Sequence, residues 1–199
     1  GMDYAFPGAP AAVDADNDGL ADLWFAADTG GQLWRFDIHH DAPAARLVSG
    51  GIIGRLGAGE GRDEVGDNRR FFASPSVAIA GGVNGPELAV AIGSGFRPSP
   101  LSVLAQNRIY LVRQRAVFAA PGEYRAVTAA DLRDASGAGA DAATAVPAAG
   151  GREAAPGWYV DLPHPGEKAL SPPLIVNDRV VFTTYTPGTA GNTCRPPPG

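Results

Sequence analysis

Acidic residues recur at every second position within one short segment. In Asp14-Ala-Asp16-Asn17-Asp18-Gly19-Leu20-Ala21-Asp22, carboxylates occupy positions 1, 3, 5 and 9, and glycine occupies position 6. Calcium is a hard cation that takes about 6–8 oxygen ligands at about 2.3–2.6 Å. Alternate residues of a tightly curled loop direct their carboxylates inward, and Gly19 permits the bend. We therefore predict a Ca²⁺ site with Asp14, Asp16, Asp18 and Asp22 as carboxylate ligands and the backbone carbonyl of Leu20 as a fifth ligand.

Electrostatics favours a bound cation in this loop. Two like charges about 4 Å apart repel by about 4 kcal/mol at an effective dielectric constant of about 20. The segment differs from an EF-hand, because its twelfth position is Phe25 where an EF-hand has a bidentate Glu. Magnesium suits the loop less, since it requires strict octahedral geometry and retains its waters. The alternative is a polar, Asp/Asn-rich turn that binds nothing.

Other candidate groups give weaker signals. His39-His40-Asp41 could bind a metal or act in acid–base chemistry, but adjacent residues of a strand point to opposite faces, which favours a solvated strand end. Lys168 is the only lysine and lies outside any glycine-rich phosphate loop, and Gly57-x-Gly59-x-Gly61 does not complete a dinucleotide motif. Cys194 is the only cysteine, so it pairs with a cysteine outside this sequence or is a free thiol.

Composition excludes several classes of function. The 199 residues carry a net charge of −5, whereas proteins that bind nucleic acid typically carry a basic surface, so nucleic-acid binding is not expected. Hydrophobic residues make up 45%, as in globular proteins, and no run of about 18 apolar residues predicts a membrane span. The chain begins Gly1-Met2, and a glycine before a methionine is typical of a cleaved expression tag, so the sequence is expected to start inside a longer protein whose signal peptide lies outside it.

Three patterned blocks along the chain predict β-structure. Each has a proline-containing entry and an apolar second strand, and the blocks cover about 10–48, 71–115 and 157–186, with insertions at 49–70 and 126–156. The strands expected from apolar and aromatic patterning are 22–28, 32–38, 46–48, 74–80, 87–92, 107–113, 157–162, 171–176 and 179–185. A short helix is expected to begin at Thr128, with Asp131 at its third position.

Repeated antiparallel meanders of this kind predict propeller blades. A ring of about seven blades at about 45 residues each needs more than about 300 residues, so this chain is too short for one. We therefore predict a single all-β domain over residues 1–199, built as a segment of a modified β-propeller. An irregular β-sandwich is the alternative.

Several of these motifs together resemble one family. Pro10-Ala-Ala-Val-Asp14, the Asp14–Asp22 loop, Leu33-Trp34-Arg35-Phe36-Asp37 and Leu170-Ser-Pro-Pro-Leu-Ile-Val176 are similar, in this order, to the C-terminal propeller of the PilY-type type IV pilus biogenesis factors and tip adhesins. The resemblance implies a calcium loop that regulates pilus extension and retraction, with Asp14, Asp16, Asp18, Leu20 and Asp22 as ligands. It also implies a place at the bacterial surface, minor pilins as partners and, in some members, host surfaces.

Three functional hypotheses follow. The first is a non-enzymatic, calcium-binding module for pilus biogenesis, twitching motility and cell adhesion, located outside the cytoplasm. The second is a quinoprotein-like propeller enzyme, whose blades also carry Gly-x-Leu-Trp-type strands. The third is an integrin-like calcium propeller that serves as a ligand-binding scaffold, which shares the loop spacing but not the Leu33–Phe36 strand.

Overall fold

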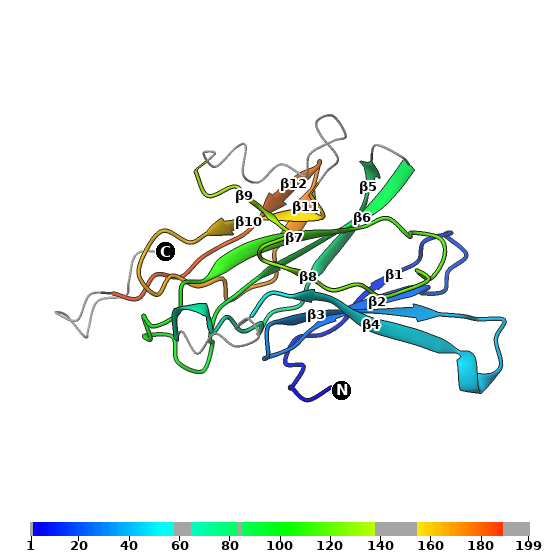
Figure 1. The fold of residues 1–199 in the computed structure, drawn as a ribbon, viewed down its shortest axis with the longest axis horizontal. Coiled ribbons are helices and arrows are strands. Elements are labelled where there is room, and N and C mark those ends of the chain that lie inside the picture. The colour runs from blue at the N-terminus through cyan, green and yellow to red at the C-terminus, as the bar shows by residue number, and fades with distance from the viewer. Residues whose placement is uncertain (1, 58–64, 83–84, 138–154, 189–199) are drawn as a thin grey trace.

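The computed structural model describes residues 2–57, 65–82, 85–137 and 155–188, and these form three β-sheets (Figure 1). The first sheet, sheet A, has the order β1-β2-β3-β4-β8, and the second, sheet B, has the order β5-β6-β7-β10-β9. The third is the hairpin β11–β12. The prediction of an all-β fold is confirmed: the described residues contain two short 3₁₀ helices and no α-helix, and none of their helices could cross a bilayer.

The elements have the following bounds: β1 Ala11–Val13, β2 Leu23–Ala27, β3 Gln32–Ile38, η1 Ala44–Arg46, β4 Val48–Arg55, η2 Val65–Asp67, β5 Ser76–Gly82, β6 Gly85–Gly93, β7 Arg108–Gln114, β8 Val127–Thr128, β9 Arg133–Asp134, β10 Gly157–Asp161, β11 Leu174–Val176 and β12 Arg179–Val181.

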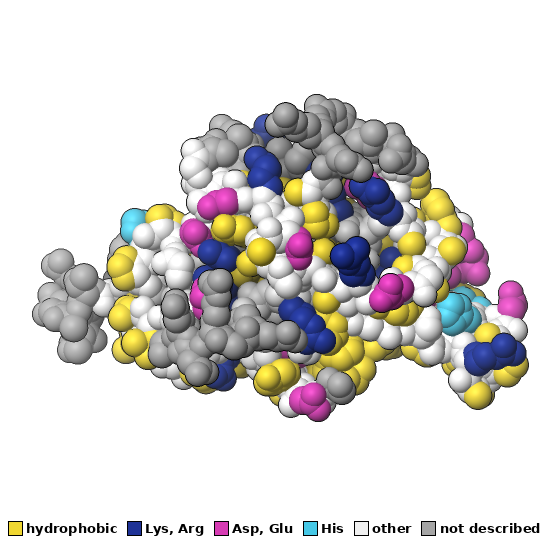
Figure 2. Space-filling view, viewed as in Figure 1, with side chains coloured by type: hydrophobic (Ala, Val, Ile, Leu, Met, Phe, Trp, Pro, Cys, Tyr) yellow, Lys and Arg dark blue, Asp and Glu magenta, His cyan; other side chains and the backbone are white. Residues whose placement is uncertain are grey.

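The sheets stack as layers, with sheet A on one side, sheet B in the middle and the hairpin on the other side (Figure 1). One apolar core lies between sheets A and B and contains Phe25, Leu33, Val90 and Tyr110. A second core lies between sheet B and the hairpin and contains Trp158 and Val180. Burial raises the pKa of Tyr110 to about 12, and its hydroxyl donates to the carbonyl of Leu56 at 3.0 Å. Figure 2 shows positive and negative side chains interspersed over the viewed surface.

Three expectations about elements are wrong. The outer strand expected at 46–48 is instead η1 followed by β4, so the segment 49–70 begins inside a strand of sheet A rather than in an insertion. The helix expected from Thr128 is a turn between β8 and β9. The strand expected at 157–162 is present as β10, but its place at the start of the third block is wrong, because it pairs with β7 of the second block. Most of the second insertion, 138–154, lies outside the described residues.

Gly157 at the start of β10 gives a test of the packing inside sheet B. A Cβ atom at this position would collide with the backbone carbonyl of Leu111 on β7. Because backbone of a central strand pair cannot move aside easily, Gly157→Ala should lower the free energy of unfolding by about 2–3 kcal/mol. Urea unfolding measures the change, and Gly81→Ala is the control, since a Cβ there meets no atom within 4 Å. Equal effects of both substitutions would contradict the packing of β10 on β7.

Candidate metal centre

The acidic loop joins the first two strands of sheet A. β1 and β2 pair antiparallel, with Val13 opposite Leu23, and the loop leaves one strand and enters the other at this pair. The backbone N–H of Asp22 donates to the carbonyl of Val13 at 2.9 Å. The N–H of Ala15 donates to Oδ2 of Asp22 at 2.7 Å. The two ends of the loop are therefore fixed to each other by hydrogen bonds from both the backbone and the last carboxylate.

The carboxylate of Asp14 organises the inside of the loop. Its Oδ1 accepts from the N–H groups of Asn17 at 2.6 Å and Asp18 at 3.2 Å, and its Oδ2 accepts from the N–H of Gly19 at 2.8 Å. Three converging donors require a tight curl, which the chain reaches with Asn17 at φ 64° and Gly19 at φ 93°. Asn and Gly are the residue types that adopt such left-handed conformations at low cost.

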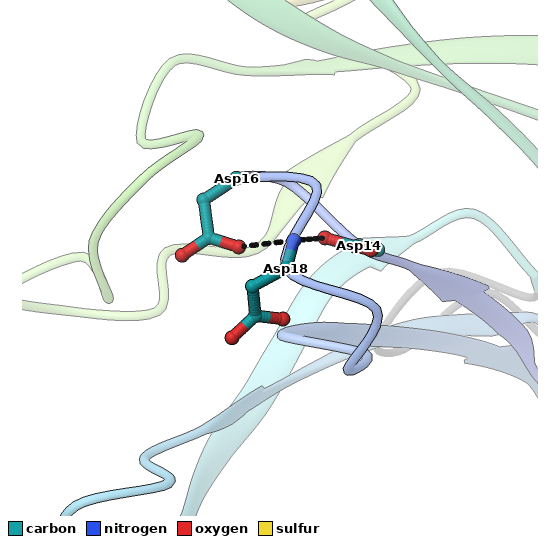
Figure 3. Close-up of side chains that lie close together, drawn as sticks. All are labelled: Asp14, Asp16 and Asp18. Atoms are coloured by element: carbon teal, nitrogen blue, oxygen red, sulfur yellow. Dashed lines mark hydrogen bonds between the residues drawn. The ribbon is translucent and has the colours of Figure 1, made fainter.

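Asp16 and Asp18 stand on the same side of this curl (Figure 3). The N–H of Asp18 donates to Oδ1 of Asp16 at 3.1 Å, and the N–H of Leu20 donates to Oδ1 of Asp18 at 2.8 Å. These contacts place one oxygen each of Asp14, Asp16 and Asp18 within 4.8 Å of one another. Oxygens bound to a single Ca²⁺ ion lie at most about 5 Å apart, so the three carboxylates fit one ion.

Asp22 and Leu20 occupy different places from these three aspartates. Asp22 is half-buried, and besides its contact with Ala15 its Oδ1 lies 3.7 Å from Nε2 of His40. The side chain of Leu20 is exposed, and its N–H is bonded to Asp18. The structure thus brings together Asp14, Asp16 and Asp18, whereas Asp22 closes the base of the loop. The ligand roles of Asp22 and of the Leu20 carbonyl stay predictions.

A buried polar network lies beneath the loop, on the strand next to β2. Asp37 on β3 pairs with Leu23 across the strands, and Arg35 holds its carboxylate in a bidentate contact, with Nε–Oδ2 at 3.0 Å and Nη2–Oδ1 at 2.6 Å. Nη2 of Arg35 also donates to the carbonyl of Ala119 at 3.3 Å. The alternation along residues 32–38 predicts that Leu33 and Arg35 share one face of the strand, but nothing in the pattern indicates the contacts of Arg35 with Asp37 or with the segment at Ala119.

The network continues to the surface through hydroxyl groups. The hydroxyl of Tyr124 donates to Oδ2 of Asp37 at 2.7 Å and lies 2.7 Å from Oγ of Ser49, which is 2.9 Å from Nε2 of His39. Since Tyr124 donates to Asp37, Ser49 donates to Tyr124 and accepts from His39, which fixes the proton of His39 on Nε2. Burial raises the pKa of Tyr124, so its hydroxyl keeps the proton that it donates to Asp37 at neutral pH.

The remaining sequence candidates form no second site in the described part of the chain. His39 and His40 follow the end of β3 at Ile38 and contact different residues, since Nε2 of His39 lies 2.9 Å from Oγ of Ser49 and Nε2 of His40 lies 3.7 Å from Oδ1 of Asp22. Lys168 is buried, and its ammonium group donates to the carbonyls of Ser102 at 2.5 Å and Gly166 at 2.6 Å. Cys194, Gly59 and Gly61 lie outside the described residues.

Comparisons with known proteins confirm the resemblance that the motifs indicated. No family model matches the sequence. The chain is 29% identical to the type IV pilus biogenesis factor PilY1 homolog of Xylella fastidiosa, over 96% of this chain and 13% of that protein. Its structure is similar to the crystal structure of the PilY1 C-terminal domain of Pseudomonas aeruginosa, with a TM-score of 0.62 at 19% identity, over 90% of this chain and 44% of that domain. The prediction of a propeller-like fold is thereby confirmed, and the chain spans less than half of either relative.

Proposed function

We propose that this chain is the calcium-binding part of a type IV pilus biogenesis protein, and that it acts by binding rather than by catalysis. The observation that carries the proposal is the curled loop whose three exposed carboxylates converge within 4.8 Å. The name of the Xylella relative, a type IV pilus biogenesis factor, supports the assignment to pilus biogenesis.

Hydrogen bonds within the loop already hold its carboxylates in place for a cation. Five backbone N–H groups, of Ala15, Asn17, Asp18, Gly19 and Leu20, already hold its carboxylates through six hydrogen bonds, because the N–H of Asp18 donates twice. Each carboxylate oxygen can accept more than one contact, so these bonds leave lone pairs for an ion. Binding Ca²⁺ then removes the mutual repulsion of Asp14, Asp16 and Asp18.

Calcium binding would act as the regulatory step. We place the protein outside the cytoplasm, at the bacterial surface, where calcium modules typically bind with dissociation constants of about 0.1–1 mM. Loading the loop would order the end of sheet A and so bias the surface offered to minor pilins and other pilus components. In this proposal the bound state sets the balance between pilus extension and retraction, and thereby surface attachment, including attachment to host receptors.

Calorimetric titration of the chelator-treated chain with calcium tests the binding step, with magnesium as the competing ion. We expect one site with a micromolar-to-millimolar dissociation constant for calcium and at least about tenfold weaker binding of magnesium, because the loop offers flexible carboxylates rather than a rigid octahedron. No heat of binding would reduce the loop to a polar turn, and equal affinity for both ions would contradict its selectivity for calcium.

The regulatory step has its own test in the source bacterium. The chromosomal variant Asp18→Asn should change surface piliation and twitching zones, whereas Asp134→Asn, an exposed aspartate far along the chain, should leave both unchanged. If the purified Asp18→Asn protein no longer bound calcium but the strain showed normal piliation, the regulatory role would be overturned. The proposal that the natural protein binds calcium would still stand.

A further inference from the structure

The loop between β6 and β7 ends in an apolar tip, residues 101–104. Within it Leu101, Val103 and Leu104 are 70%, 55% and 67% exposed. A single exposed aliphatic side chain is common on protein surfaces, but three within four positions gather apolar surface in one place, which marks an interaction site. Figure 1 shows this green loop at the left end of the molecule, opposite the end where β1 and the acidic loop lie, and Figure 2 shows hydrophobic side chains at the same left end.

The backbone of the tip is anchored from below. The ammonium group of the buried Lys168 donates to the carbonyl of Ser102 at 2.5 Å, and the N–H of Ser102 donates to the carbonyl of Ser99 at 3.2 Å. Gly166 packs so closely on the tip that a Cβ there would lie 2.8 Å from the carbonyl oxygen of Ser102. These contacts prevent the loop from folding back, so its aliphatic side chains stay in solvent.

The surroundings of the tip are basic. Residues 96–106 contain no Asp or Glu, although the whole chain has a net charge of −5. Arg97 is exposed in a turn that leads to the tip, where the N–H of Ser99 donates to the carbonyl of Phe96 at 3.1 Å. The guanidinium of Arg70 lies over the ring of Phe96, 4.7 Å from its centroid. Two cations therefore stand beside the base of the apolar tip.

Acidic side chains on the adjoining segments do not cancel this charge. Glu167 is 7% exposed, and its carboxylate accepts the N–H of a neighbouring backbone group. Asp67 and Asp161 are paired with other arginines, Arg69 at 2.9 Å and Arg108 at 2.6 Å. The charge that this end of the molecule presents to solvent is therefore positive.

We propose that this end of the molecule binds the surface of an anionic phospholipid bilayer. The aliphatic side chains of the tip would enter the boundary between headgroups and hydrocarbon, while Arg97 and Arg70 would contact lipid phosphates. Apolar area and attraction between basic side chains and anionic lipids are the two terms that drive such interfacial binding. The binding is separate from the proposed calcium site, since the two lie at opposite ends of the molecule (Figure 1).

The composition of the tip favours lipid over a protein partner. Residues that dominate the binding energy of protein interfaces are enriched in Trp, Tyr and Arg, whereas Leu, Ser and Val are under-represented among them. The tip reads Leu101-Ser102-Val103-Leu104. A fluid hydrocarbon layer accepts projecting aliphatic side chains without a complementary pocket, so an anchored loop with flanking cations meets its requirements.

Co-sedimentation with lipid vesicles tests the proposal on the 199-residue chain. Phosphatidylcholine vesicles with and without phosphatidylglycerol are compared in the presence of a chelator, so that calcium cannot bridge the acidic loop to lipid. We expect binding at least about tenfold tighter to the vesicles that contain phosphatidylglycerol, and weaker binding as salt is added. Arg97→Gln should reduce this preference for the anionic vesicles.

Two double variants locate the contact. Leu101→Ser with Leu104→Ser should weaken binding to anionic vesicles by at least about tenfold, because it removes most of the apolar area of the tip. Leu174→Ser with Val181→Ser is the matched control, since these aliphatic residues are 58% and 51% exposed on the hairpin β11–β12. The control variant should bind as the unmodified chain does, and thermal unfolding checks that both variants are folded.

Three results would overturn the assignment. Undiminished binding of the Leu101/Leu104 variant would place the lipid contact elsewhere on the protein. Equal binding to both kinds of vesicle, or to neither, would contradict an anionic lipid surface as the partner. A dimer in sedimentation equilibrium that the same variant abolishes, without vesicle binding by the unmodified chain, would identify a second copy of the chain as the occupant of the tip.

Discussion

Replacing Asp18 by Asn should weaken calcium binding by about 100-fold while the protein keeps its fold and stability in the presence of a chelator. An ion of charge +2 at about 2.4 Å from a carboxylate gains about 3 kcal/mol from it even at the dielectric constant of water, which corresponds to about two orders of magnitude in affinity. The amide oxygen of Asn still accepts the N–H of Leu20, as Oδ1 of Asp18 does at 2.8 Å, so the loop conformation is retained. Calorimetric titration and thermal unfolding measure the two quantities.

Asp134→Asn is the matched control for this experiment. Asp134 is also exposed, and its Oδ1 also accepts an N–H two residues further on, from Ser136 at 2.9 Å. Each substitution therefore removes one charge from an exposed carboxylate that accepts the N–H two residues further on, at Asp18 inside the acidic loop and at Asp134 outside it. A similar affinity for calcium in the two variants would show that Asp18 is not a calcium ligand.

The acidic loop could be predicted from sequence because its chemistry is local. Asp14, Asp16 and Asp18 lie within five residues, and the turn residues Asn17 and Gly19 lie between and directly after them. Spacing alone therefore determined that three carboxylates meet. Asp22 differs because its position depends on where β2 begins, and its carboxylate accepts the N–H of Ala15 instead of joining the cluster.

The missed strand β4 shows the limit of residue patterns. Gly50 and Gly51 are typical of a connection, yet both lie in the middle of β4. A Cβ at Gly50 would lie 2.5 Å from a ring carbon of Phe36, and one at Gly51 would lie 2.5 Å from Cβ of Tyr124. These glycines make room for aromatic neighbours, which is a recognised role of glycine in strands. The neighbours are distant in sequence, so the pattern could not show them.

The helix expected after Thr128 failed for a different reason. The local contact exists, because the N–H and Oγ1 of Thr128 both donate to Oδ2 of Asp131 at 2.8 Å. The contact closes a turn here rather than a helix, since Arg133 and Asp134 pair in parallel with Trp158 and Tyr159 of β10. Sheet pairing across the fold outweighed a weak local preference.

The buried ion pair between Arg35 and Asp37 leads to the prediction with the largest effect on stability. Both side chains are almost fully buried, and they contact each other in a bidentate arrangement. Asp37→Ala removes the counter-charge and leaves the Arg35 guanidinium in the core, where its Nη1 already lacks a hydrogen-bond partner among the described residues. Stranding a buried charge in this way typically costs about 3–5 kcal/mol. Such a loss is a large part of the about 5–15 kcal/mol that stabilises a domain, and urea unfolding will measure it.

The double variant separates the charge from the packing. Arg35→Met in the Asp37→Ala background removes the stranded guanidinium and keeps an apolar side chain of similar reach beside Ala119. Because replacing a whole buried ion pair by apolar groups is often nearly neutral, the double variant should regain most of the stability that Asp37→Ala loses. Recovery would show that desolvation of Arg35, rather than lost contacts of Asp37 with Tyr124, causes the loss. If the double variant were as unstable as the single one, the hydroxyl network that links Asp37 to Tyr124 and Ser49 would be the stabilising element instead.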